Sequence, residues 1–418
     1  MNKIQLPVDK LRPGMYVAEL DRPWLGLPFA LEGFSIISRD QIDELGKHCK
    51  TVFVDFDRKA ADNQCRRQAD VKTWSRRAED EAIGSAWLTD NDCRHLETTS
   101  VEQELSTAGK IHSALEESIG TSLDKMRREG DLDPAPLKNA VGSMTRSIER
   151  NPDAMMLLSK IRKKGRRELD RAVDTSIHMI TFGRFLQFPS EQLELLGLAG
   201  LLLDIGKIYV PDTILQKQGA LTAEEFSQAK THVVQSVGHI RAALELPSGL
   251  DDIVLEHHER LDGSGYPRAL RGGPFTTEAA IAGLVDSYSA LTSVRPYAVQ
   301  ASPSRALSVL HKLRGKLFDG ALVEQFIQCI GIYPVGSAVE LNTGEIGIVI
   351  AQNLVRRLQP RVMVIFDSAG RPLSRQSILD LINEPKATAD EPYRVRRTLP
   401  RDWVPIEAEQ LLSQVSRH

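Results

Sequence analysis

Residues 257–267 of this chain, HHERLDGSGYP, combine two adjacent imidazoles with a turn that glycine can shape. Imidazole and carboxylate side chains together suit borderline divalent metals such as zinc, manganese and iron. The Asp-Gly-Ser-Gly run favours a tight turn, because Gly263 and Gly265 can take positive φ and let a ligand approach the backbone. The segment therefore predicts a metal site beside a ligand-binding turn or, more simply, a helix end followed by a polar loop.

Two flanking segments favour the metal interpretation. Residues 201–217 read LLLDIGKIYVPDTILQK, with His232 after them, and residues 284–297 read LVDSYSALTSVRPY. From about residue 150 to 330, apolar residues recur at intervals of three and four, which predicts helices. Bundle cores build metal sites from side chains that point inward from several helices. The fold predicted for this part is therefore a helical bundle.

This ordered set of motifs resembles the HD-GYP family, a branch of the HD metal-dependent phosphohydrolases that cleave the bacterial second messenger cyclic di-GMP. The resemblance covers roughly residues 150–335. It implies a mainly α protein built on an HD-type helical bundle, a divalent metal (iron, manganese or zinc), and cyclic di-GMP or a related nucleotide as ligand.

The resemblance also assigns roles to individual residues. Five side chains match the family's metal ligands: Asp204, His232, His257, His258 and Asp286. Asp204 is also expected to be catalytic. Lys207 lies three residues after it, hence on the same face of a continuing helix, where its ammonium could meet a phosphate oxygen, so it is the second expected catalytic residue. The expected nucleotide contacts are Gly263, Gly265, Tyr266, Pro267 and Arg295.

Two positions depart from the family pattern. Leu203 stands where the histidine of the HD pair belongs, and its isobutyl group has no lone pair for a metal. Arg171 stands where an upstream histidine belongs, and its permanent charge would repel a cation unless the side chain turned away. His178 lies two turns further along, about 10 Å of helical rise, so it is too far to substitute.

These losses fall on one metal site. That site keeps only Asp204 and Asp286, whereas the ligands of the second site are all present. We therefore expect at most one tightly bound metal, weak or lost hydrolysis, and retained binding of nucleotide or of a partner signalling protein. The alternatives are an active cyclic di-GMP phosphodiesterase that yields linear dinucleotide or GMP, and a phosphohydrolase acting on another nucleotide.

Composition bounds the remaining possibilities. The net charge of −3 predicts no large surface for nucleic acid, and four cysteines without CxxC spacing indicate a reducing compartment. The amino terminus lacks a signal-peptide core, and no run of about 18 apolar residues occurs. These features predict a cytoplasmic protein with no membrane segment.

At 418 residues the chain is long enough for two or three domains, and its patterns suggest four parts. They are a small α/β domain (1–57), a linker and helical connector (58–149), the HD-GYP domain (150–335), and a β-hairpin segment with a tail (336–418). In the first part, four short strands and one helix ending at Gly46 are expected. That part resembles a domain that often precedes HD-GYP, so a sensory or docking role is hypothesised.

The connector either pairs with a second copy in a homodimer or packs on its own domain.

Overall fold

The structure is a computed structural model, and it describes most of the chain. The described residues are 3–13, 15–21, 34–36, 39–55, 97–161, 167–243, 245–272, 275–293, 301–353, 356–388 and 391–399. They group into two compact units, one containing two small β-sheets and one made of helices. The mainly α fold predicted from the sequence is confirmed. Among the helices of these ranges, none is long and apolar enough to cross a membrane.

The amino-terminal sheet has the four strands expected from the sequence. Its elements are β1 (Lys3–Pro7), η1 (Val8–Lys10), β2 (Tyr16–Leu20), β3 (Phe34–Ser35), α1 (Arg39–His48) and β4 (Thr51–Asp55). The strands pair antiparallel in the order β1-β4-β2-β3. The predicted end of the helix at Gly46 was wrong by two residues. The turn continues because the Cys49 amide donates to the Leu45 carbonyl, and both side chains are buried in one apolar core.

The helical unit begins with a group of long helices. They are α3 (Val101–Glu129), α4 (Pro134–Arg150), α5 (Pro152–Ile161), α6 (Arg167–Phe185) and α7 (Ser190–Leu202). A capping box between Ser100 and Gln103 starts α3, and Gly130, with φ of 73°, ends it. Asp133 then caps α4, and Pro134 occupies its first turn.

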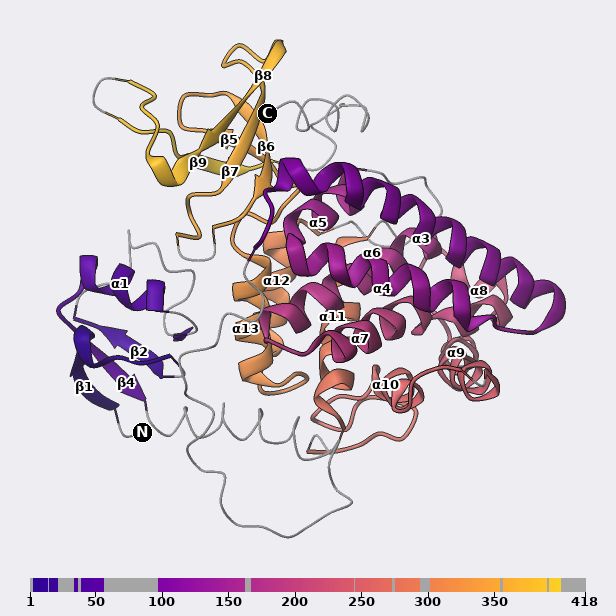
Figure 1. Ribbon diagram of the computed structural model, residues 1–418. Helices are drawn as coiled ribbons and strands as arrows, with labels where there is room; N and C mark the ends of the chain where they lie inside the picture. The colour runs from indigo at the N-terminus through magenta and orange to yellow at the C-terminus, as the bar shows by residue number, and fades with distance from the viewer. Residues whose placement is uncertain are drawn as a thin grey trace. The chain divides into compact units, whose positions relative to one another are not determined.

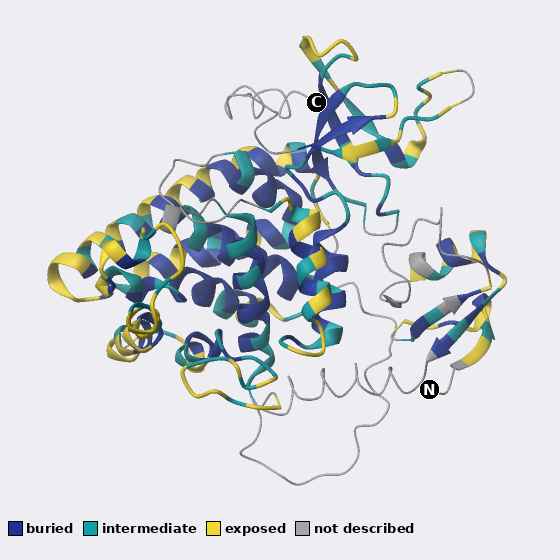
Figure 2. Cartoon of the chain, turned by 180° about the vertical axis from the view of Figure 1, so that it is seen from behind, coloured by how far each residue is buried: buried dark blue, intermediate teal, exposed yellow. Residues whose placement is uncertain are grey.

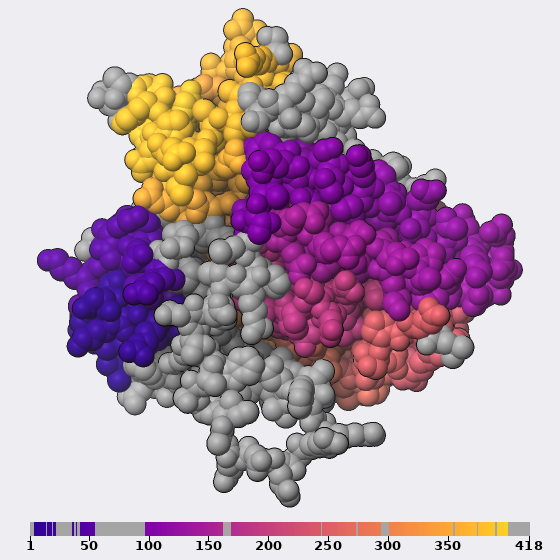
Figure 3. Space-filling model, in the orientation of Figure 1, coloured from indigo at the N-terminus to yellow at the C-terminus, as the bar shows by residue number. Residues whose placement is uncertain are grey.

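The helical connector packs on its own unit. Helix α3 contacts α4 and α5, and α4 contacts α7, so α3 lies along one side of the helical unit (Figure 3). The buried residues gather where these helices face one another (Figure 2). In the described residues, the helices of the connector thus pack on the same chain, which is one of the two expected arrangements.

Shorter elements complete the helical unit. They are η2 (Ile205–Tyr209), α8 (Asp212–Leu215), α9 (Ala223–Ala242), α10 (Leu250–Glu256), α11 (Thr277–Thr292) and α12 (Pro303–Leu313). Helix α13 (Gly320–Ile330) begins in this unit, and its residues from Glu324 onwards belong to the other one. Helix α9 packs against η2 and α10, and α11 packs against α6 and α10 (Figure 1). A Cβ on Gly200 would lie 2.5 Å from the Ser176 Cα, so glycine lets α7 approach α6 closely. This approach fixes the end of α7, from which the chain enters the candidate site.

The carboxyl-terminal sheet is larger than the sequence predicted. It comprises β5 (Ala338–Leu341), β6 (Ile346–Ala351), β7 (Arg361–Phe366), β8 (Pro372–Asp380) and β9 (Val395–Thr398), with η3 (Leu381–Asn383) after β8. The strand order is β8-β7-β6-β5-β9, and Gly344, with φ of 98°, shapes the predicted turn between β5 and β6. For roughly the last 50 residues the sequence predicts no more than a mixed surface tail, whereas the structure places β8 and β9 there. Both strands are held by pairing with β7 and β5, and neither carries a strong apolar alternation of its own.

The packing of α3 can be tested at Leu115, whose side chain is fully buried. Replacing Leu115→Ala should lower the free energy of unfolding by about 2–5 kcal/mol, because a cavity replaces the lost side chain. Glu117→Ala, at an exposed position of the same helix, serves as the control and should change it little. Equal effects of the two changes in urea unfolding would show that α3 is not packed on the unit.

Candidate metal centre

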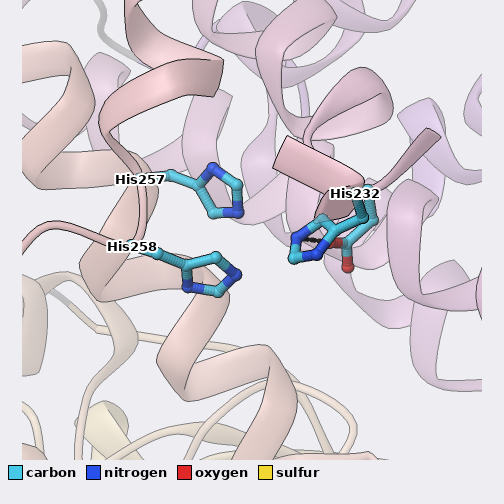
Figure 4. Close-up of side chains that lie close together, drawn as sticks. His232, His257 and His258 are labelled. Carbon is cyan, nitrogen blue, oxygen red and sulfur yellow. Dashed lines mark ion pairs between the residues drawn. The ribbon is translucent and has the colours of Figure 1, made fainter. Parts of the chain in front are cut away.

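Four of the predicted ligands lie together in the helical unit. His232 lies on α9, His257 and His258 lie at the end of α10, and Asp204 directly precedes η2. Each offers one ligand atom, and these atoms all lie within 4.8 Å of one another. The ring centroids of His257 and His258 are 3.9 Å apart, and both imidazoles point towards His232 (Figure 4). The group supplies three nitrogens and one carboxylate oxygen, a donor set suited to zinc, manganese or iron.

Two residues that sequence reasoning missed position Asp204. A Cβ on Gly206 would lie 2.2 Å from the His232 carbonyl oxygen, so only glycine lets η2 approach α9 at this point. The Ser236 hydroxyl accepts from the Gly206 amide at 2.8 Å and donates to the Leu203 carbonyl at 3.1 Å. Asp204 is therefore clamped against the helix that carries His232. The glycine of the DIGK motif was the available signal for this contact.

Backbone carbonyls orient two of the imidazoles. His232 Nδ1 lies 2.7 Å from the Ala229 carbonyl oxygen, and His257 Nδ1 lies 2.6 Å from that of Val254. Because a carbonyl can only accept, Nδ1 carries the proton and the Nε2 lone pair is left for a metal.

Unsatisfied polar atoms mark the space between the four side chains. His232 Nε2, His257 Nε2 and Asp204 Oδ1 are buried and have no hydrogen-bond partner in the described part of the chain. His232 Nε2 lies 3.3 Å from Asp204 Oδ1. Buried polar atoms without partners are costly. A divalent cation would satisfy all three, so the residues present fit the metal that the sequence predicted.

The protonation states of the group suit a metal as well. Burial lowers the pKa of His257 to about 4, although the charges of Asp286 and Asp204 oppose this, and burial lowers the pKa of His258 well below its usual value. Burial alone would raise the pKa of Asp204, but the charges of Lys207 and Arg171 outweigh it and hold that pKa well below its usual range. These imidazoles are thus neutral and the carboxylate is ionised, as metal ligation requires.

Asp286, the fifth predicted ligand, lies outside this group of four. Its carboxylate pairs with the guanidinium of Arg171, through Nη2 and Oδ1. Arg171 Nη1 also lies 3.7 Å from Asp204 Oδ2. The expectation that Arg171 repels a cation unless it turns away was therefore incomplete. The side chain points into the site, because two carboxylates there attract it.

The glycine turn is built against the metal centre. A Cβ on Gly265 would lie 2.5 Å from the His258 carbonyl oxygen and from the Glu259 Cα, so the close approach requires glycine. Gly263 takes the positive φ expected of it, 77°, whereas Gly265 does not and serves the close approach alone. The buried Glu259 carboxylate accepts from the Arg268 and Leu270 amides, at 2.7 and 2.9 Å. The carboxylate of the HHE run therefore holds the turn.

Tyr266 and Lys207 border the centre. The Tyr266 amide donates to the His258 carbonyl at 3.2 Å, and the two rings are 4.6 Å apart; Pro267 follows. Lys207 Nζ lies 2.6 Å from Asp204 Oδ2, on the face predicted for it. Arg295 lies outside the described residues.

Two further side chains that the sequence did not single out surround Tyr266. The Phe226 ring, on α9, lies 6.1 Å from the Tyr266 ring, and Lys230 Nζ lies 4.9 Å from the Phe226 centroid and 5.7 Å from that of Tyr266. Phe226 is about half exposed, at 48%. An exposed aromatic ring and a cation thus stand beside the turn that carries Tyr266.

The close approach at Gly265 predicts the outcome of a single added methyl group. Gly265→Ala should displace the turn from His258 and Glu259, and the protein should lose bound metal. Gly238→Ala is the matched control, because a Cβ at this position on α9 would meet no atom within 4 Å. Metal content measured after dialysis should fall for the first variant only. Full retention of metal by Gly265→Ala would contradict the packing described.

The depressed pKa of His257 predicts how the metal-free protein responds to acid. Between pH 6.5 and about 4, the unfolded chain binds a proton that the folded chain excludes, so stability falls as the pH is lowered through this window. Across this window the exclusion of a proton from His257 alone should lower the free energy of unfolding by about 3 kcal/mol, and His258 should lower it further. Urea unfolding at a series of pH values should show this slope, and His257→Leu should flatten it. An unchanged slope in that variant would refute the assignment.

Three known protein families match successive parts of the chain. The family described as "HD domain" matches residues 155–322, a "Domain of unknown function (DUF3391)" matches residues 3–137, and a "KOW domain associated with HD domain" matches residues 338–391. The first match contains all the predicted site residues, and the third contains strands β5 to β8.

Two curated proteins are similar to this chain over different lengths. Cyclic di-GMP phosphodiesterase PA4108 of Pseudomonas aeruginosa is 30% identical over 90% of this chain and 88% of its own length. The cyclic di-GMP phosphodiesterase response regulator RpfG of Xanthomonas campestris pv. campestris is 37% identical over 34% of this chain and 38% of its own.

A solved structure, described as Bd1817, a HDG"Y"P protein from Bdellovibrio bacteriovorus, covers 78% of this chain and 98% of its own, with 14% identity and a TM-score of 0.45.

The family-model match and the relative of nearly full length, together with the DIGK and HHE…DGSGYP motifs, show that this chain belongs to the HD-GYP family of HD-domain proteins.

Proposed function

We propose that this chain is a cyclic di-GMP signalling protein that binds the nucleotide at a one-metal centre and hydrolyses it slowly or not at all. One observation carries the proposal: Asp204, His232, His257 and His258 converge. The resemblance to the family adds that Leu203 and Arg171 stand where two other ligands are expected. The centre is thus complete on one side and depleted on the other.

The four converging side chains would hold the metal. A bound divalent ion polarises a phosphate oxygen and lowers the pKa of bound water. Leu203 supplies no ligand for a second ion, and Asp286 is engaged by Arg171. Losing the second ion removes charge stabilisation worth several kcal/mol. Every 1.4 kcal/mol lost slows a reaction about tenfold, so turnover should fall by orders of magnitude.

The residues around the centre suit a cyclic dinucleotide. Lys207 stands beside Asp204, where its ammonium can meet a phosphate oxygen. Tyr266 offers an aromatic face next to His258. Phe226 offers a second one beside Tyr266, and Lys230 adds a positive charge near both rings. Stacking of a base on an aromatic ring contributes about 1–3 kcal/mol. Gly263, Gly265, Pro267 and Arg295 belong to the same proposed nucleotide site, which can keep much of its affinity when hydrolysis is lost.

A second candidate function is an active phosphodiesterase that yields linear dinucleotide or GMP. The names of the curated relatives favour it, because the relative that covers 90% of this chain is called a cyclic di-GMP phosphodiesterase. A related nucleotide is a further option, since another relative is named a 3'3'-cGAMP-specific phosphodiesterase.

The setting of the protein is proposed on the same grounds. In a signalling role the chain would bind a partner signalling protein or a second copy of itself. Residues 1–57 would be the sensory or docking part. We also propose that the protein acts in the cytoplasm, where it would meet the nucleotide.

The proposal predicts binding without rapid turnover. Purified protein should contain about one metal ion per chain, bind cyclic di-GMP in a calorimetric titration, and give little linear dinucleotide or GMP by chromatography. Leu203→His with Arg171→His should raise hydrolysis by at least tenfold, because both missing ligands return.

Adding His232→Asn to that double variant is the control, and it should abolish the gain. Rapid hydrolysis by the unaltered protein would select the phosphodiesterase instead. No binding of cyclic di-GMP, with metal in place, would exclude both candidates.

A further inference from the structure

We propose that the side chain of Arg171 is a built-in cation that takes the place of a second metal ion and limits the centre to one ion. Arg171 acts here as a positioning residue, because it contacts the two carboxylates and no reacting atom. The inference rests on the one-metal centre of the proposed function. It also explains why a second ion should not bind even when metal is in excess.

The first support is geometric. The two terminal nitrogens of Arg171 reach two different carboxylates: Nη2 pairs with Asp286 Oδ1, and Nη1 lies 3.7 Å from Asp204 Oδ2. Asp204 and Asp286 are the two ligands of the depleted metal site that this chain retains. A planar guanidinium with two forked donors can bridge two carboxylates in this way, whereas an ammonium presents one point charge. The guanidinium therefore engages the oxygens that a second ion would need.

The second support is charge balance. Asp204 carries one negative charge and pairs with Lys207 at 2.6 Å, while Asp286 pairs with Arg171. The carboxylates are thus balanced before any metal binds. A first divalent ion can use the unsatisfied lone pairs at His232 and His257, whereas a second one would have to displace Arg171.

The third support is burial. The Arg171 side chain is 19% exposed and that of Asp286 is 6% exposed. Ion pairs shielded from solvent are screened less by salt, and removing one partner leaves an uncompensated charge. Arg171 lies on α6, Asp286 lies on α11, and Asp204 follows α7. The guanidinium therefore also ties three elements together, as a bridging metal would.

Metal stoichiometry tests the proposal directly. The unaltered protein should saturate at one Mn²⁺ per chain, however much is added, when free Mn²⁺ is measured by electron paramagnetic resonance. Arg171→Ala should bind a second, weaker ion, because Asp204 and Asp286 lose their cation. Arg171→Lys should stay at one, since it keeps a positive charge there.

Two controls isolate the effect. Asp286→Asn added to Arg171→Ala should return the count to one, because a second ion then has a single carboxylate. Arg241→Ala removes an exposed arginine that pairs with Asp251 at 2.8 Å, and it should leave the count at one. Two ions in the unaltered protein, or one ion in folded Arg171→Ala at saturation, would overturn the proposal.

Thermal unfolding gives a readout that does not depend on hydrolysis. Metal-free Arg171→Ala should unfold at a lower temperature than the unaltered protein, and excess Mn²⁺ should raise its midpoint by more than it raises that of the unaltered protein. Equal shifts in both proteins would count against the proposal. If nucleotide binding is absent while these results hold, the proposed function fails and the role of Arg171 stands.

Discussion

The carboxylate of Asp204 is the group on which the centre depends, because three cationic or metal-binding side chains meet there. Lys207 lies 2.6 Å away, His232 lies 3.3 Å away, and Arg171 lies 3.7 Å away. On the protein surface these charge interactions would contribute little to stability, as exposed ion pairs generally do. In the interior the same charges act strongly, and they keep the carboxylate ionised despite its burial.

Close backbone contacts make this cluster rigid, and they depend on glycine. Gly206 lets η2 touch α9 beside His232, Gly265 lets the glycine turn touch the chain at His258, and Gly283 lets α11 approach the His257 carbonyl oxygen, where a Cβ would lie 2.6 Å away. Each contact fixes one ligand-bearing segment against another. The metal site is thus a property of how segments 204–207, 232–236 and 257–266 pack, as much as of the ligands themselves.

The sequence predicted the ligands better than their surroundings. The four residues that lie together, Asp204, His232, His257 and His258, were expected from the resemblance to the HD-GYP family, which matched each of them to a metal ligand. The orientation of Arg171 could not be predicted, because a sequence shows the charge of a side chain and leaves its partners open. Strands β8 and β9 were missed for a similar reason: their pairing with β7 and β5 is a tertiary interaction. The Ser236 clamp depends on a hydroxyl 30 residues from Gly206 in sequence, which no local pattern indicates.

The most direct measurement of the central claim is anomalous diffraction from crystals of the full chain grown with excess Mn²⁺. We expect one anomalous peak, surrounded by Asp204, His232, His257 and His258, with Arg171 still against Asp286. Two peaks bridged by Asp204, with Arg171 displaced, would contradict it.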